Sequence, residues 1–145
     1  MILEDNDGAE NRGESQSILL VDDNATVRQA LGMILELEDG LHVAGEARTA
    51  EEAMKLIKSI QPTVAIIDIS LNKSDGVALL REAKALAPEM KAIIFSLHDE
   101  SLYIDAARDA GADAYIMKSE EPRVIIQTIR TTLAGKQRFP APATS

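Results

Sequence analysis

The chain of 145 residues contains no cysteine and no tryptophan, and only two phenylalanines and two tyrosines. The lack of cysteine excludes disulfides, thiol catalysis and cysteine-ligated metals. With so few aromatic rings, no stacking platform for nucleic-acid bases is apparent. No apolar run approaches the ~18 residues of a membrane-spanning helix, and the acidic, polar N-terminus is unlike a signal peptide. We therefore expect a cytoplasmic protein without a membrane segment.

Basic residues are also scarce, because 15 lysines and arginines face 24 acids and leave a net charge of −9. Binding to a phosphate backbone needs a basic surface, so we expect no direct nucleic-acid binding through this chain. Residues 1–16 carry many of the acids, and we predict them to be a disordered tail. Residues 136–145 are predicted to be a C-terminal tail or linker, which leaves 17–135 as one domain.

Short apolar segments alternate with helical patterns in this domain. We predict strands at 17–21, 41–47, 63–68, 91–96 and 114–118. Each is followed by apolar residues at helical spacing, and the last four helices are placed at 49–60, 75–88, 101–111 and 122–135. Apolar strands joined by helices indicate a parallel sheet covered on both faces. The predicted fold is α/β, a doubly wound (βα)5 flavodoxin-like sandwich with strand order 2-1-3-4-5.

Polar residues stand where four of the predicted strands end. Asp22 and Asp23 follow the first strand, Asp68 ends the third, Ser96 the fourth and Lys118 the fifth. These side chains should meet, because parallel strands share one carboxyl edge. Three neighbouring carboxylates destabilise one another, and a hard divalent cation such as Mg²⁺ would relieve the repulsion. A single aspartate after a strand is more often a helix N-cap, so the combination is what favours a metal site.

The same groups suit phosphoryl transfer. A carboxylate can attack phosphorus and form an acyl phosphate, and catalysis then depends mainly on positioning and electrostatic stabilisation. Asp68 is the predicted acceptor because it lies on the central strand. Mg²⁺, Lys118, and Ser96 together with backbone N–H groups would each bind one phosphoryl oxygen.

Four motifs, LLVDD, AIID, IIFS and YIMK, resemble the acidic pair, phosphoacceptor, switch hydroxyl and lysine of response regulator receiver domains of two-component signalling. The resemblance implies that Asp68 takes a phosphoryl group from a sensor histidine kinase or phosphotransfer protein. It also implies that Asp23, Asp68 and the carbonyl of Ser70 hold Mg²⁺, with Asp22 assisting through water.

The resemblance covers residues 17–135 and includes the Asp75–Gly76 pair. The segments VAGEARTAEEAM, GADAYIMKSEEP and LAGK are similar to the NarL/FixJ-like subfamily, whose receivers precede a helix-turn-helix DNA-binding domain. That domain is absent from the sequence, so we expect either a truncated chain or a stand-alone receiver.

The resemblance further implies a two-state switch. Ser96 would turn towards the phosphoryl group, and Tyr115 would enter the space that it leaves. The helix–strand–helix face of residues 101–135 would then change its packing, select a partner or output domain, and allow phosphorylation-dependent homodimerisation. Ser70 and His98 would flank the attacking water and tune the phosphoryl lifetime. Taken singly, Tyr115 would be ordinary strand packing and His98 a solvated loop residue.

Two positions depart from the family pattern. Asn72 stands where the loop after the phosphoacceptor usually has a proline. Ser119 follows Lys118, where a proline with a cis peptide bond is common. A cis bond before serine would cost ~3 kcal/mol, so we predict a trans Lys118–Ser119 bond.

Three other functions compete with this interpretation. An aspartyl-phosphate phosphatase of the haloacid dehalogenase type would place Asp-x-Asp after its first strand, whereas Asp22 and Asp23 are adjacent. A nucleotide-binding flavodoxin-like protein would need a glycine-rich phosphate loop, which VDDNATV lacks. A receiver-like interaction module that works without phosphorylation stays open. We expect no enzymatic activity beyond the chain's own phosphorylation and dephosphorylation.

Overall fold

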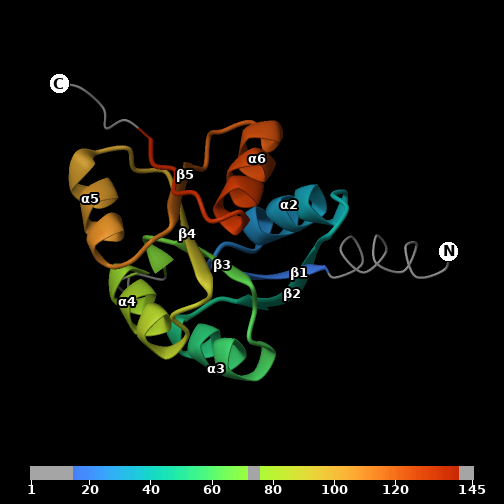
Figure 1. Cartoon of the computed structure of the whole chain (residues 1–145), viewed down its shortest axis with the longest axis horizontal. Coiled ribbons are helices and arrows are strands. Elements are labelled where there is room, and N and C mark those ends of the chain that lie inside the picture. The colour runs from blue at the N-terminus through green and yellow to red at the C-terminus, as the bar shows by residue number, and fades with distance from the viewer. Residues whose placement is uncertain (1–14, 72–75, 141–145) are drawn as a thin grey trace, which may run out of the picture.

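The computed structural model describes residues 15–71 and 76–140 (Figure 1). Most of the predicted N-terminal tail therefore lies outside the described residues, as do Asn72, Asp75 and residues 141–145.

The described residues form a five-stranded parallel sheet in the order β2-β1-β3-β4-β5. The strands are β1 (Gln16–Val21), β2 (Leu41–Ala47), β3 (Val64–Asp68), β4 (Lys91–Ser96) and β5 (Ala114–Met117). This topology confirms the predicted doubly wound fold. β3 is buried along its whole length, whereas β2 at the edge is largely half-buried, because only a central strand has neighbours on both sides as well as helices on both faces.

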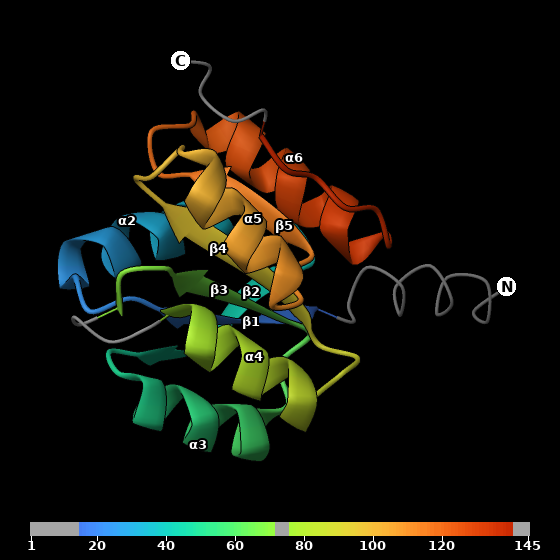
Figure 2. The same ribbon diagram turned by 90° about the vertical axis from the view of Figure 1, so that its left-hand side faces the viewer.

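Five helices cover the two faces of the sheet: α2 (Ala25–Glu36), α3 (Ala50–Ile60), α4 (Gly76–Leu86), α5 (Ser101–Asp109) and α6 (Pro122–Leu133). Apolar residues of α3, α4 and α5 form one buried cluster with the sheet, and those of α2 and α6 form the other. Figure 2 shows α3 and α4 below the strands and α6 above them. Among the described residues, no helix is both long and apolar enough to cross a membrane.

The starts of α2 and α3 follow local side-chain signals. Thr49 Oγ1 accepts a hydrogen bond from the Glu52 N–H at 3.1 Å, so it caps α3. The Glu52 carboxylate reaches back to the N–H of Arg48 rather than that of Thr49. Asn24 caps α2 through a 3.1 Å bond from the Val27 N–H. Neither aspartate before Asn24 is used as the helix cap.

The chain beyond α6 differs from the predicted tail. Residues 136–140, here called the C-terminal segment, run along the outer edge of β5. Arg138 forms a parallel bridge with Ala114, and its carbonyl accepts a hydrogen bond from the Tyr115 N–H at 3.0 Å. Phe139 packs against the α3–α4–α5 cluster. An edge strand has unpaired backbone groups, and this segment satisfies part of that edge.

Candidate functional site

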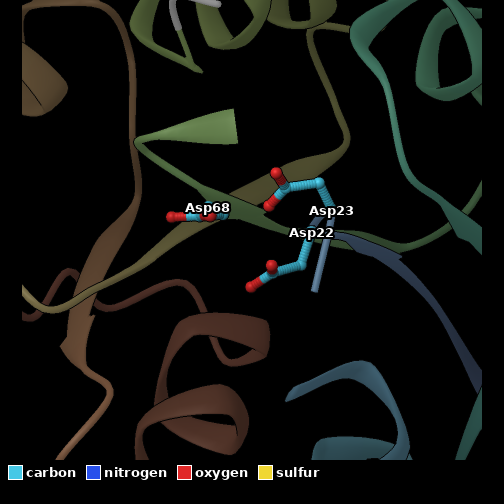
Figure 3. Close-up of side chains that lie close together, drawn as sticks. All are labelled: Asp22, Asp23 and Asp68. Carbon is cyan, nitrogen blue, oxygen red and sulfur yellow. The ribbon is translucent and has the colours of Figure 1, made fainter. Parts of the chain in front are cut away.

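Three aspartates meet at the carboxyl edge of the sheet (Figure 3). Asp22 and Asp23 directly follow β1, and Asp68 is the last residue of β3. Because β1 and β3 are adjacent strands, their ends bring the three side chains together. One carboxylate oxygen of each residue lies within 4.8 Å of the others. Asp22 and Asp68 are buried, whereas Asp23 is exposed.

Lys118, the first residue after β5, places its ammonium between two of these aspartates. Its Nζ lies 2.9 Å from Oδ2 of Asp22 and 3.6 Å from Oδ1 of Asp68. The shorter contact is an ion pair without hydrogen-bond geometry, so the buried Oδ2 of Asp22 has no hydrogen-bond partner among the described residues. A buried carboxylate oxygen left in this state can accept a cation or the water of a hydrated cation.

Burial raises the pKa of Asp68 above its ordinary value of 3.8, and this is the largest effect on the group. The Ser70 N–H, which donates to Asp68 Oδ1 at 3.1 Å, lowers the pKa, as does the Lys118 ammonium. The charges of Asp22 and Asp23 raise it. The ionised form of Asp68 is therefore less stable than that of a solvated aspartate, and a bound cation would stabilise it.

The aspartates open into a surface pocket of about 190 Å³. It is lined by residues at or just past the ends of four strands: Asp22, Asp23, Asn24, Asp68, Ser70, Leu97, His98 and Lys118. Mg²⁺ prefers oxygen ligands and keeps several of its waters, so it needs only one or two carboxylates and an open position. The clustered carboxylates and their opening to the pocket therefore fit a Mg²⁺ ion.

Arg28, on the first turn of α2, holds the turn that carries the acidic pair. Its Nη1 donates to the carbonyl of Asp22 at 2.6 Å, and its Nε donates to Glu46 Oε1 on β2 at 2.8 Å. The side chain is only 11% exposed. The Asp22 carboxylate is held as well, because its Oδ1 accepts the Asn24 N–H at 2.9 Å.

The other predicted site residues lie at the rim of the pocket or behind it. His98 Nε2 is 3.4 Å from Oγ of Ser70, and both residues line the pocket. Ser96 is fully buried and is not among the residues that line the pocket. Its Oγ accepts the His98 N–H at 2.9 Å. Tyr115 is 2% exposed, and its hydroxyl donates to the His98 carbonyl at 2.6 Å. Burial raises the pKa of this hydroxyl, which keeps it protonated as a donor.

The backbone of β5 sets the position of the lysine. The Lys118 N–H donates to the Ser96 carbonyl at 2.7 Å, which extends the pairing of β5 with β4 by one residue. No peptide bond within the described ranges is cis, so the predicted trans bond between Lys118 and Ser119 is confirmed. The ammonium reaches both Asp22 and Asp68 with this trans bond in place.

Comparison with known proteins assigns the family. The model of the response regulator receiver domain matches residues 18–130. The chain belongs to this family. Its structural match to a LuxR-family two-component response regulator from an Aurantimonas species has a TM-score of 0.82 and 31% identity over 86% of this chain and 89% of that one. A CheY-like receiver protein from Methanospirillum hungatei matches with a TM-score of 0.77 and 35% identity, over 83% and 95% of the two chains.

Curated relatives of this receiver are transcriptional regulators. YhcZ of Bacillus subtilis, an uncharacterized transcriptional regulatory protein, is 30% identical over 77% of this chain and 52% of its own length. The nitrate/nitrite response regulator protein NarP of Escherichia coli is 29% identical over 84% of this chain and 57% of its own. The chain thus spans about half the length of the curated relatives it matches. These relatives are signalling proteins, and no enzyme family is indicated.

Sequence reasoning missed Arg28 as part of this receiver's site. A positive charge in the first turn of a helix is disfavoured by the helix dipole, and α2 has no acidic residue in that turn to offset it. That mismatch was the available signal that Arg28 binds something outside its helix. It did not identify the Asp22 carbonyl or Glu46 as the partners, because these contacts depend on how α2 packs against the sheet.

We expect Arg28→Gln to weaken Mg²⁺ binding by about tenfold, the lower end of the loss when an outer-shell partner of a metal ligand is removed. Loss of the positive charge alone would strengthen cation binding. Weaker binding would therefore show that Arg28 positions the acidic pair. Titration calorimetry with Mg²⁺ measures the effect. Arg123→Gln, at a side chain that is 83% exposed, is the matched control. Equal affinities in both variants would contradict the positioning role.

Proposed function

We propose that Asp68 accepts a phosphoryl group from a sensor histidine kinase or a phosphotransfer protein. The observation that carries this proposal is the meeting of Asp22, Asp23, Asp68 and Lys118 at one pocket. Together they supply an acceptor carboxylate, ligands for a divalent cation and a fixed positive charge. Membership of the receiver family supports the same chemistry.

In the proposed step, a carboxylate oxygen of Asp68 forms a bond to phosphorus while the bond from phosphorus to the donor's histidine nitrogen breaks. The electron pair of that bond leaves with the imidazole, and nothing is oxidised or reduced. Asp23, Asp68 and the Ser70 carbonyl would hold Mg²⁺, with Asp22 acting through water, and the ion would neutralise charge on the phosphoryl oxygens. The Lys118 ammonium, 3.6 Å from Asp68 Oδ1, is placed to bind another of these oxygens.

The proposed output is a change in the α5–β5–α6 face. Ser96 would exchange its bond with the His98 N–H for a stronger, charge-assisted bond to the phosphoryl group. Tyr115 would then move into the space behind it and alter the packing of α5. The changed face would bind a partner or a second copy of the chain. With a net charge of −9, this receiver would leave nucleic-acid contacts to a partner or output domain.

Intact-mass spectrometry after incubation with acetyl phosphate and Mg²⁺ tests the proposal. We expect a single phosphoryl adduct that disappears when EDTA removes the metal, and slower adduct formation in Lys118→Ala. If acetyl phosphate and several histidine kinases all leave the wild-type mass unchanged, the phosphorylation-independent interaction module becomes the better account.

Replacing His98 with alanine should speed hydrolysis of the adduct several-fold while leaving its formation intact. The His98 ring stacks on Tyr103 with centroids 4.2 Å apart and reaches Ser70 across the pocket, so its loss opens a path for water to the phosphoryl group. The decay of the adduct mass after removal of acetyl phosphate gives the rate. Leu102→Ala, at an exposed neighbouring position, is the control. An unchanged decay rate in His98→Ala would show that His98 does not control the phosphoryl lifetime.

A further inference from the structure

The backbone of the C-terminal segment pairs with β5 at Arg138. Arg138 bridges Ala114, and the Arg138 carbonyl accepts the Tyr115 N–H at 3.0 Å. The Arg138 side chain is exposed, so only its backbone takes part in this attachment. Figure 1 shows the segment passing β5 between α5 and α6.

Phe139 anchors the segment beside that hydrogen bond. Its side chain packs against the buried cluster to which Tyr115 belongs, and the guanidinium of Arg108 on α5 lies 4.4 Å from its ring centroid. The cation over the aromatic ring and the partial burial of Phe139 both favour this docked position. The segment therefore contacts both β5 and α5, two of the three elements of the proposed output face.

Tyr115 connects this segment to the pocket. Its backbone N–H holds Arg138, and its hydroxyl donates to the His98 carbonyl at 2.6 Å. His98 lines the pocket and lies 3.4 Å from Ser70. His98 and Tyr115, joined by a hydrogen bond, thus connect the pocket rim to the C-terminal segment.

We propose that residues 136–140 dock on the outer edge of β5 and that phosphorylation stabilises this docked state. This inference rests on the proposed phosphorylation of Asp68. Phe139 packs against the buried cluster that contains Tyr115, and the Tyr115 N–H donates to the Arg138 carbonyl, so the position of Tyr115 and the docking of the segment depend on each other. An inward Tyr115 and a docked segment therefore stabilise each other. Phosphorylation would draw the ring further inward as Ser96 turns away.

Such coupling is reciprocal, because each of two linked equilibria changes the other by the same factor. Loosening the C-terminal segment should therefore weaken binding of a phosphoryl group or its mimic at Asp68. The segment also covers the β5 edge, so its docking controls how much of that edge a second copy of the chain can reach.

Amide hydrogen exchange followed by NMR tests this coupling on the whole chain, with Mg²⁺ and the phosphomimetic beryllofluoride. We expect exchange of the Tyr115 N–H to slow about fivefold, the low end of measured couplings between sites. The Asp113 N–H, bonded to the Ala92 carbonyl on the β4 side of the chain that enters β5, serves as the internal reference. Phe139→Ala should speed Tyr115 exchange without beryllofluoride and weaken beryllofluoride binding by up to about fivefold, the coupling factor itself.

Two further variants separate the contacts. Arg138→Ala keeps the backbone bond and should behave as the wild type. Tyr115→Phe keeps the ring and the N–H but loses the bond to His98, so its segment should stay docked without responding to beryllofluoride. If beryllofluoride binds the wild type and Tyr115 exchange does not slow, the docking inference fails and the proposed function stands. If neither an acetyl-phosphate adduct nor beryllofluoride binding is found, both fail.

Discussion

Asp68→Asn is expected to abolish the phosphoryl adduct completely and to stabilise the unmodified fold at neutral pH. The amide that replaces the carboxylate is not a nucleophile towards phosphorus, and no acyl phosphate can form on it. Intact-mass spectrometry with acetyl phosphate and Mg²⁺ measures the loss. An adduct of normal yield in Asp68→Asn would show that another residue is the acceptor.

The stabilising effect follows from the raised pKa of Asp68. Burial raises this pKa in the folded chain above its ordinary value of 3.8, so the folded state binds more protons than the unfolded state between the two pKa values. The contribution of protonated Asp68 to the stability of the fold is therefore fully present below pH 3.8. It is lost as pH rises through the pKa of the folded state. At pH 7 the ionised Asp68 destabilises the fold, and asparagine removes that effect.

Thermal unfolding of both proteins in EDTA, between pH 7 and acidic pH, checks the sign. The melting temperature of Asp68→Asn should exceed that of the wild type at pH 7, and the gap should close as pH falls. Added Mg²⁺ should raise the wild-type melting temperature more than that of the variant, because the ion binds the folded carboxylates. Asp109→Asn, which removes a charge from an exposed residue of α5, should show neither effect.

Gly76→Ala is expected to cost about 1–3 kcal/mol of stability, as overpacking of a tight interior does. A Cβ at residue 76 would lie 2.5 Å from the carbonyl oxygen of Asp68 and 2.6 Å from that of Ile69. Both neighbours are backbone atoms, and the Ile69 carbonyl also accepts the Gly76 N–H at 3.2 Å. The methyl group must therefore push α4 away from the end of β3.

Because the displaced backbone carries the acceptor, Gly76→Ala should also slow adduct formation at Asp68. Urea unfolding gives the stability change, and the time course of the phosphoryl adduct gives the rate. Gly32→Ala is the matched control, since a Cβ there meets nothing within 4 Å, and alanine in the interior of α2 should stabilise by about 0.5–1 kcal/mol. Equal stability of the two variants would contradict the close-approach argument.

The sequence by itself determined the fold and the family of this receiver. The spacing of apolar residues that marks a strand or a helix is visible within a short stretch of sequence. In a parallel sheet, the carboxyl ends of all strands lie at one edge. The positions of Asp22, Asp23, Asp68 and Lys118 at strand ends were therefore readable without coordinates. The order 2-1-3-4-5 was predicted as well, and the structure confirms it.

Only the tertiary structure decided which contacts these residues make. Arg28 reaches the Asp22 carbonyl because α2 packs beside β2, and Ser96 bonds to the His98 N–H rather than facing the pocket. The need for glycine at residue 76 became clear only from the carbonyl groups that face it.

Docking of the C-terminal segment was not predicted, because Phe139 alone does not identify the cluster against which it packs. The edge of β5 that receives it exists only after five strands from distant parts of the chain have assembled. A side chain's rotamer and a strand's free edge both depend on neighbours remote in sequence, whereas helical and strand periods are local. That difference is the physical reason why the positions of these residues at strand ends could be predicted and their contacts could not.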